Sequence, residues 1–174
     1  MIEELIRSGL FKTKVIDLKR NDLLIREGQK ENHLYYVKTG ALRAFTQIED
    51  EEFTIRLAYS DSIVASIPSF FTEEPSGLFI EAIRKSTVFQ INKSEFEDYF
   101  AQDEMHLKQY NALLKDLVAS FYEREIDLLT SSPAERIQRM LKRSPHVFQE
   151  IPHKYIASYL RMSPETLSRF INVD

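Results

Sequence analysis

Residues 151–171 read IPHKYIASYLRMSPETLSRFI, and this stretch decides how the C-terminal part of the chain folds. Ile156 and Leu160 are spaced as the apolar stripe of a short helix, which breaks at residues 161–163. Ser163 then has the residue type of a helix N-cap, and proline follows it at the first helical position. The spacing predicts two short helices joined by a tight turn, which is a helix-turn-helix.

The second of these helices, residues 164–171, combines a buried and a polar face. Leu167, Phe170 and Ile171 lie at i, i+3 and i+4, which predicts that they pack inward. The opposite face is a candidate for DNA contact, because such a helix can place polar side chains in a major groove. The candidate residues are Ser163, Glu165, Thr166, Ser168, Arg169 and Asn172. Two ordinary packed helices are the alternative that this stretch leaves open.

Charge is distributed unevenly along the 174 residues. The chain as a whole carries a net charge of −4, but residues 131–174 hold 7 Lys and Arg against 4 Asp and Glu. A local basic excess beside the predicted helix-turn-helix fits phosphate contact. The basic residues at 136, 139, 142 and 143 lie off the apolar side of their helix, which predicts a solvated surface that could also contact phosphates.

Composition indicates an ordinary globular protein, since 43% of the residues are hydrophobic and 29% are charged. No apolar run approaches the ~20 residues of a membrane span, so we expect no membrane contact. The chain has no cysteine, which excludes disulfides and thiolate metal sites and fits a cytoplasmic location. Its four histidines lack the spacing of a metal site, and we expect no metal, no cofactor and no enzymatic activity.

Residues 15–91 contain short runs rich in β-branched and aromatic residues, separated by turn signals. Many short strands at regular spacing predict a sandwich or barrel. Gly28 and Gly40 are expected to supply positive φ at two of the turns. Residues 62–77 break the rhythm and predict a helical turn plus loop that could line an effector pocket. The pocket candidates are Ser66, Ile67, Phe70, Phe71, Ser76 and Gly77.

Residues 103–129 predict one long helix, uninterrupted by Gly or Pro from residue 104 onward. Apolar residues repeat at heptad spacing over more than three heptads, which is typical of a helix that pairs with a second copy. A monomeric core helix is the alternative. The residues of this candidate dimer seam are Leu107, Tyr110, Leu114, Leu117, Phe121 and Leu128.

The order of these elements resembles the Crp/Fnr family of bacterial transcription regulators across nearly the whole chain. The resemblance rests on LLIREGQKENHLYYVKTGALRAF (residues 23–45) and on SPAERIQRMLKRSPHVFQEIPHKYIASYLRMSPETLSRF (residues 132–170). The second stretch is similar to the family's short members in Bacteroidetes. The resemblance implies that Glu165, Thr166 and Arg169 read bases, with Ser163 and Ser168 near the DNA backbone.

The expected fold is therefore α+β. Residues 1–130 should form a cyclic nucleotide-binding-like β-roll (a double-stranded β-helix) with the long helix. Residues 131–174 should form the helix-turn-helix domain, without the full wing common in the family. A hinge is expected at residues 131–133.

The resemblance fails where relatives bind cyclic AMP. Those relatives carry a Gly-Glu pair and an Arg-Thr or Arg-Ser pair, whereas Ser66-Ile67 and Ser76-Gly77 stand at these places here. A phosphate without a cation is costly to desolvate, so cyclic AMP should not bind in the family's manner. Relatives also often place Gly where Arg161 stands, and a left-handed Arg161 would store roughly 1 kcal/mol of strain.

These observations predict a homodimeric transcription regulator that binds a pseudo-palindromic site on double-stranded DNA. RNA polymerase and an unidentified small-molecule effector are further candidate partners. The alternative is a dimeric small-molecule sensor, or a protein-interaction module, that has lost DNA binding. The acidic net charge and the short C-terminus keep that alternative open.

Overall fold

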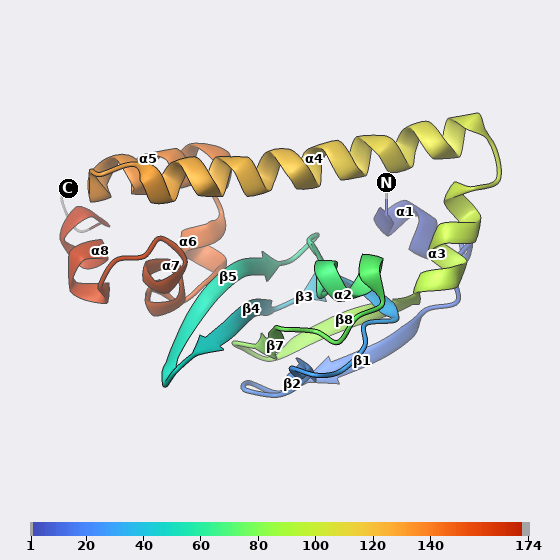
Figure 1. The fold of residues 1–174 in the computed structure, drawn as a ribbon, viewed down its shortest axis with the longest axis horizontal. Coiled ribbons are helices and arrows are strands. Elements are labelled where there is room, and N and C mark those ends of the chain that lie inside the picture. Colours follow the sequence, from blue (N-terminus) through green and yellow to red (C-terminus); the bar gives the residue numbers. More distant parts are fainter. Residues whose placement is uncertain (1, 172–174) are drawn as a thin grey trace. The chain divides into compact units, whose positions relative to one another are not determined.

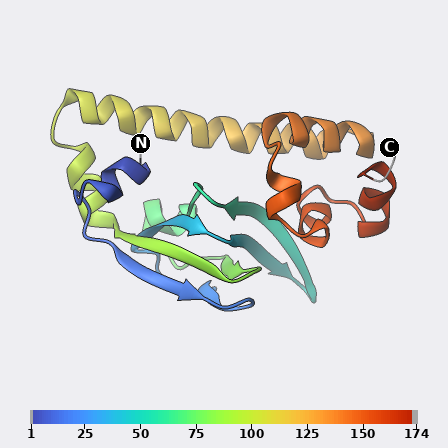
Figure 2. The same cartoon turned by 180° about the vertical axis from the view of Figure 1, so that it is seen from behind.

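Two antiparallel sheets form between residues 14 and 92 of the computed structural model, which describes residues 2–171 (Figures 1 and 2). One sheet has the strand order β1-β8-β3-β6 and the other the order β2-β7-β4-β5. The strands are β1 (Lys14–Leu18), β2 (Leu23–Ile25), β3 (His33–Thr39), β4 (Ala41–Ile48), β5 (Glu51–Tyr59), β6 (Ile63–Val64), β7 (Phe79–Ala82) and β8 (Ser86–Asn92). Helix α1 (Ile2–Arg7) precedes them, and α2 (Ile67–Thr72) lies between β6 and β7.

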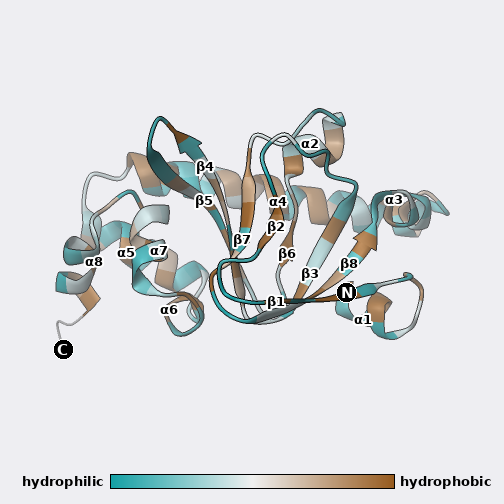
Figure 3. Cartoon of the chain, turned by 90° about the horizontal axis from the view of Figure 1, so that it is seen from below, coloured by the Kyte–Doolittle hydropathy of each residue, from teal (hydrophilic) through white to brown (hydrophobic). Residues whose placement is uncertain are grey.

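The core of this β-roll comes from alternate residues of both sheets, since successive side chains of a strand point to opposite faces. Leu42 and Ala44 of β4 pack in one cluster with Val37, Ile80 and Val88, and all five are buried. Strands of both sheets accordingly include hydrophobic segments in Figure 3. The predicted strands and the α+β class are confirmed, and the short β6 is an addition to them.

On its other face, β4 carries a buried ion pair. Arg43 lies directly opposite Glu81 in the register and donates to it through Nε (2.9 Å) and one terminal nitrogen (2.7 Å). Burial lowers the pKa of the Arg43 guanidinium, but hydrogen bonds to Glu52 and Glu81 outweigh this and raise it overall. The next outward residue, Phe45, stacks on Phe79 with ring centroids 5.1 Å apart. The pairing fixes the register of β4 against β7.

Gly40, between β3 and β4, has φ 90°, as its place in the sequence predicts. A Cβ atom there would lie 2.4 Å from the carbonyl oxygen of Lys85. This turn therefore requires glycine on two grounds, because other residues rarely adopt such a φ and because the backbone of residue 85 leaves no room. Gly28 also has positive φ (82°) but faces open space.

The C-terminal part of the chain is helical. Its helices are α4 (Glu104–Leu129), α5 (Pro133–Arg143), α6 (Val147–Glu150), α7 (His153–Tyr159) and α8 (Pro164–Ile171). Asp103 caps α4, because its carboxylate accepts the His106 N–H (2.9 Å), and Ser132 caps α5. The short α6 was not predicted. No helix within residues 2–171 is long and apolar enough to span a membrane.

The backbone divides into two compact units, Met1–Phe96 and Glu97–Asp174. Helix α3 (Lys93–Phe100) crosses this division, and α4 falls in the second unit with the helix-turn-helix. The structural division thus comes before α4, whereas the sequence places a domain boundary at residue 130. The boundary at residue 130 remains a prediction. The expected absence of a wing also remains one, because it concerns residues beyond those that the structure describes.

Candidate functional site

The turn between α7 and α8 is tight because one residue takes a left-handed conformation. Arg161 has φ 54°, so it is left-handed at the position where many relatives place glycine. The Met162 N–H then donates to the carbonyl oxygen of Ala157 (3.0 Å), and the Arg161 N–H to that of Ser158 (3.2 Å). These bonds satisfy carbonyls at the end of α7 and reverse the chain within a few residues.

Ser163 starts α8 as predicted. Its hydroxyl accepts the Thr166 N–H (3.2 Å), and its carbonyl accepts the Leu167 N–H (3.0 Å). Leu167 is fully buried, but Phe170 is 44% exposed, so the prediction of an inward Phe170 is wrong. Since residues of a helix advance by about 100°, Phe170 is turned about 60° from Leu167 and lies at the edge of the packed face.

The side of α8 away from Leu167 is polar and accessible. Glu165, Ser168 and Arg169 are exposed there, and Thr166 is half-buried. The pKa of Glu165 is lowered by its own backbone N–H, then by the Ser163 hydroxyl and by the charge of Arg169. The predicted set therefore lies together on one short helix, apart from Asn172, which lies outside the described residues.

The second candidate site is the cassette, by which we mean α2 and its flanks, residues 66–77. Ser66 and Ser76 are both buried, and their hydroxyl oxygens lie 2.7 Å apart. Ser76 also donates to the carbonyl of Leu78 (2.9 Å) and accepts the Leu78 N–H (3.0 Å). These serines are the first residues of the two pairs that stand where relatives carry Gly-Glu and Arg-Thr or Arg-Ser, and here they bind each other.

The remaining cassette residues are divided between core and surface. Phe70 is buried and meets the exposed Phe71 edge-to-face, with centroids 5.4 Å apart. Ile67 is half-buried at the start of α2, and Gly77 follows Ser76 in the loop. An effector pocket lined by these cassette residues remains a prediction.

A buried carboxylate next to the cassette was missed by the sequence analysis. Glu31 is 1% exposed and accepts the N–H groups of His33 (3.1 Å) and Ser66 (3.4 Å), together with the Tyr35 hydroxyl. Its own N–H donates to the Ser69 hydroxyl (2.9 Å). Burial raises the pKa of Glu31 to about 7, although these hydrogen bonds oppose the change. Glu31 thus connects the start of β3 to both ends of the first turn of α2.

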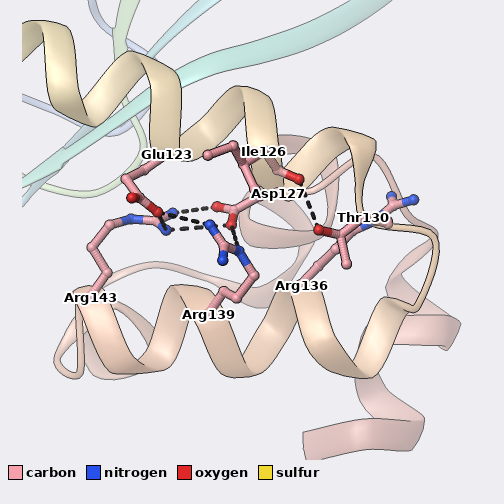
Figure 4. Close-up of polar contacts among 7 residues, drawn as sticks. All are labelled: Glu123, Ile126, Asp127, Thr130, Arg136, Arg139 and Arg143. Atoms are coloured by element: carbon pink, nitrogen blue, oxygen red, sulfur yellow. Dashed lines mark hydrogen bonds and ion pairs between the residues drawn. The ribbon is translucent and has the colours of Figure 1, made fainter.

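A second missed carboxylate lies at the junction of α4 and α5. Asp127 of α4 is fully buried and contacts two arginines of α5 (Figure 4). Arg139 donates to Oδ1 (2.8 Å), and Arg143 donates to Oδ2. Glu123, one turn earlier on α4, pairs with Arg139 at 2.8 Å. We call these four residues the junction cluster; it shows that Arg139 and Arg143 are not simply solvated, as predicted, but pair within the chain.

The candidate dimer seam on α4 is only partly accessible. Leu107 and Phe121 are exposed, while the other predicted seam residues are half-buried, and Tyr110 stacks on Phe100 with centroids 5.5 Å apart. Further exposed apolar residues of α4, outside the predicted seam, lie together on a neighbouring stripe of the helix. They are Val118, Tyr122, Ile126 and Leu129.

Within residues 2–171, no group of three or more His, Cys, Asp or Glu side chains could hold a metal ion. On α8 the described candidate residues are hydroxyls, one carboxylate and one guanidinium, and in the cassette they are hydroxyls and apolar groups. They can donate and accept hydrogen bonds on the exposed face of α8 and enclose polar atoms in the cassette.

Comparison with known proteins agrees with the fold described above. The sequence pattern of the cyclic nucleotide-binding domain matches residues 15–103, which is about half of the chain. The chain belongs to this family. No curated protein sequence matches it.

Solved structures of the same fold include bacterial regulators of the Crp/Fnr type. FixK2 from Bradyrhizobium japonicum has a TM-score of 0.78 at 18% identity, covering 91% of this chain and 82% of its own. A CooA mutant from Carboxydothermus hydrogenoformans has 0.69 at 17%, covering 95% and 77%. CLP from Xanthomonas campestris, described as a c-di-GMP responsive global regulator, has 0.66 at 14%, covering 97% and 89%. At such low identity these structures establish a shared fold.

Proposed function

We propose that this member of the cyclic nucleotide-binding domain family is a DNA-binding transcription regulator that acts as a homodimer. The observation that carries the proposal is the exposed polar face of α8, with Arg169 at its centre, directly after a tight helix-helix turn. The likeness to structures that are described as regulators supports it. Helix α8 would be the recognition helix, lying in the major groove.

Each residue on this face has a chemical role in the proposal. Arg169 would donate two hydrogen bonds to a guanine, the commonest specific contact of arginine with a base. Glu165 would accept from a cytosine amino group, and Thr166 would contact a neighbouring base. Ser163 and Ser168 would donate to phosphates, which fix the position of α8 without reading sequence.

The dimer would form through α4. We place its interface on the exposed stripe Val118, Tyr122, Ile126 and Leu129, with Leu107 and Phe121 at its edge. Apolar residues at these spacings share one helix face, and covering them with a second copy removes them from water. Tyr122→Glu should therefore convert the dimer to a monomer in sedimentation equilibrium. Leu117→Glu changes the half-buried side of α4, and this variant should remain a dimer if it folds.

The cassette would not bind a cyclic nucleotide through its phosphate. The side chains at the glutamate and arginine positions of those relatives are Ile67 and Ser76, and the Ser76 hydroxyl already bonds to that of Ser66. A phosphate placed there would lose its water without gaining a cation. Calorimetric titration with cyclic AMP should give no heat of binding up to millimolar ligand, and micromolar affinity would contradict this part of the proposal.

The experiment that tests DNA binding is selection of bound sequences from a random pool, followed by titration across a salt series. A regulator should select a pseudo-palindrome and lose affinity steeply as salt rises. Arg169→Ala should then reduce affinity for the selected site roughly 5- to 150-fold, equivalent to about 1–3 kcal/mol, and relax the preference at one base pair. Arg20→Ala removes an exposed arginine of the other unit and serves as the control.

Two results would contradict the proposal. If no sequence is enriched over the starting pool, the chain does not recognise DNA, and a sensor or protein-interaction role takes its place. If a site is enriched but Arg169→Ala binds it as wild type does, another surface reads the DNA.

A further inference from the structure

The junction cluster connects α4 to the helices that carry α8, and no sequence motif assigns it a role. We propose that Asp127 is a positioning residue, which holds the helix-turn-helix in one orientation relative to α4. The inference rests on the proposed function, because its consequence is the spacing at which a dimer binds two DNA half-sites. It concerns contacts within the second compact unit alone.

The geometry of the Asp127 carboxylate restricts α5 in two directions. Oδ1 accepts from Arg139 (2.8 Å) and from Arg143 (3.4 Å), Oδ2 accepts from Arg143, and the two arginines are four residues apart on α5 (Figure 4). A rotation of α5 about its axis, or a slide along it, would break at least one of these contacts. Glu123 reinforces the arrangement, lying 2.8 Å from Arg139 and 3.7 Å from Arg143.

The charge of the cluster also opposes separation of the helices. Burial lowers the pKa of the Arg143 guanidinium, but its hydrogen bonds and attraction to Asp127 outweigh this and raise it overall. A rotation or slide of α5 that broke these contacts but kept Asp127 covered would leave a buried carboxylate without its cations. An uncompensated buried charge is strongly unfavourable, so such a movement is costly.

A third arginine continues the connection from α5 to the turn before α8. Arg136 donates to the carbonyl of Thr130, the residue that ends α4. Its terminal nitrogen donates to the carbonyls of Leu160 (3.1 Å) and Arg161 (3.4 Å). Helix α5 is thus bonded to α4 through three arginines and to the helix-helix turn through one of them.

The chain between α4 and α5 therefore does not act as a swivel, in contrast to the hinge that the sequence suggests at residues 131–133. With the junction closed, two copies related by a two-fold axis present their recognition helices at one separation. For a helix-turn-helix dimer that separation is about 34 Å, one turn of DNA. We call the contacts of Asp127 with Arg139 and Arg143 the clamp. Loss of the clamp should weaken the preference for this spacing and leave the bases chosen within each half-site unchanged.

The test is DNA binding by the full chain to its selected site and to the same site with 2 base pairs inserted between the half-sites. We expect the insertion to weaken wild-type binding at least tenfold and Asp127→Asn binding less than threefold. Asp116→Asn makes the same chemical change at an exposed position of α4 and should behave as wild type. Arg143→Gln removes one arm of the cluster, and it is the second variant if Asp127→Asn does not fold.

If the insertion weakens binding by the folded variants tenfold or more, the proposed role of Asp127 is contradicted, because the half-site spacing would then be set elsewhere. So would a changed base preference within the half-sites, since that would make the cluster part of recognition itself.

A second measurement needs no DNA. The chain contains no cysteine, so Lys108→Cys and Ser168→Cys can place two spin labels, one on α4 and one on α8. Labelled chains diluted with unlabelled ones should give one narrow distance distribution, which broadens in the Asp127→Asn or Arg143→Gln background and not in Asp116→Asn. An unchanged distribution would overturn the clamp. If wild type binds no DNA, the proposed function fails, but this distance still decides the clamp.

Discussion

Glu31 in the β-roll and Asp127 in the helical unit are both buried carboxylates, with 1% and 0% of their surfaces exposed. They differ in their partners. Glu31 is held by backbone N–H groups and a tyrosine hydroxyl, whereas Asp127 is held by two guanidinium groups. Neutral donors leave the carboxylate able to take up a proton, and the pKa of Glu31 is raised to about 7. The cassette can therefore respond to protonation near neutral pH, while the junction is built from paired charges that resist movement.

The largest effect in this comparison should come from Asp127→Asn. Removing one partner of a buried ion pair costs about 3–5 kcal/mol when the other partner stays buried. Arg139 and Arg143 have side chains 30% and 26% exposed, so part of their charge can be solvated. We therefore expect a loss of about 2–3 kcal/mol in the free energy of unfolding, measured by urea denaturation.

The control for this measurement is Asp116→Asn, which should change the free energy of unfolding by less than about 0.5 kcal/mol. A loss below about 1 kcal/mol for Asp127→Asn would mean that the junction is stabilised by apolar packing and not by its charges.

Glu31→Gln should produce an effect of similar size that depends on pH. Because the folded pKa of Glu31 (about 7) lies above its ordinary value, the folded chain binds more protons than the unfolded chain between about pH 4.5 and 7. Its contribution to stability is complete below pH 4.5 and is lost as the pH rises through 7. The stability of wild type relative to Glu31→Gln should thus fall by up to about 3 kcal/mol across this window.

The quantity to compare is the difference in free energy of unfolding between wild type and Glu31→Gln, because other groups also titrate. His33 lies beside Glu31, and burial lowers its pKa, which makes stability rise with pH and opposes the Glu31 effect. Unfolding curves are measured for both proteins from pH 4.5 to 8, and subtracting the two free energies of unfolding cancels the contribution of His33. A difference that stays constant within 0.5 kcal/mol would show that Glu31 does not titrate in this range.

Both carboxylates also illustrate which parts of the molecule can be predicted from sequence. The strands and α8 follow from local patterns: short runs rich in β-branched and aromatic residues between turns, and Ser163 before Pro164 at a helix start. Glu31 gives no such signal, because a glutamate in the polar run QKEN resembles a solvated loop residue. Its burial depends on α2, which begins more than thirty residues later.

The spacing of the junction cluster residues is visible in the sequence. Glu123 and Asp127 are four residues apart on one helix, and Arg139 and Arg143 are four residues apart on the next. Each pair shares a helix face, and a short connection makes the two helices neighbours. What the sequence cannot supply is the packing angle that points one face at the other, so from the sequence alone the arginines are expected to be solvated.

Ser76→Ala tests whether the cassette is held by its own hydroxyls. The variant would leave the buried Ser66 hydroxyl and the backbone of Leu78 without their bonds to Ser76. A lost hydrogen bond between neutral groups costs about 1 kcal/mol, so we expect about 1–2 kcal/mol by urea denaturation. Ser8→Ala, at an exposed hydroxyl, should cost less than about 0.5 kcal/mol. Equal effects of the two variants would mean that the Ser66–Ser76 contact contributes little.

Arg161→Gly should have the smallest effect and the opposite sign. The left-handed conformation of Arg161 (φ 54°) costs an arginine about 1 kcal/mol and a glycine almost nothing. Glycine loses more conformational entropy on folding, so we expect a net gain of about 0.5 kcal/mol by thermal unfolding. Arg161→Ala keeps the strain and should give no gain. Because Arg136 binds the carbonyl of residue 161 and not its side chain, the gain should be the same in the Asp127→Asn background. A gain that disappears there would mean that the junction cluster, and not the turn itself, holds residue 161 in its left-handed conformation.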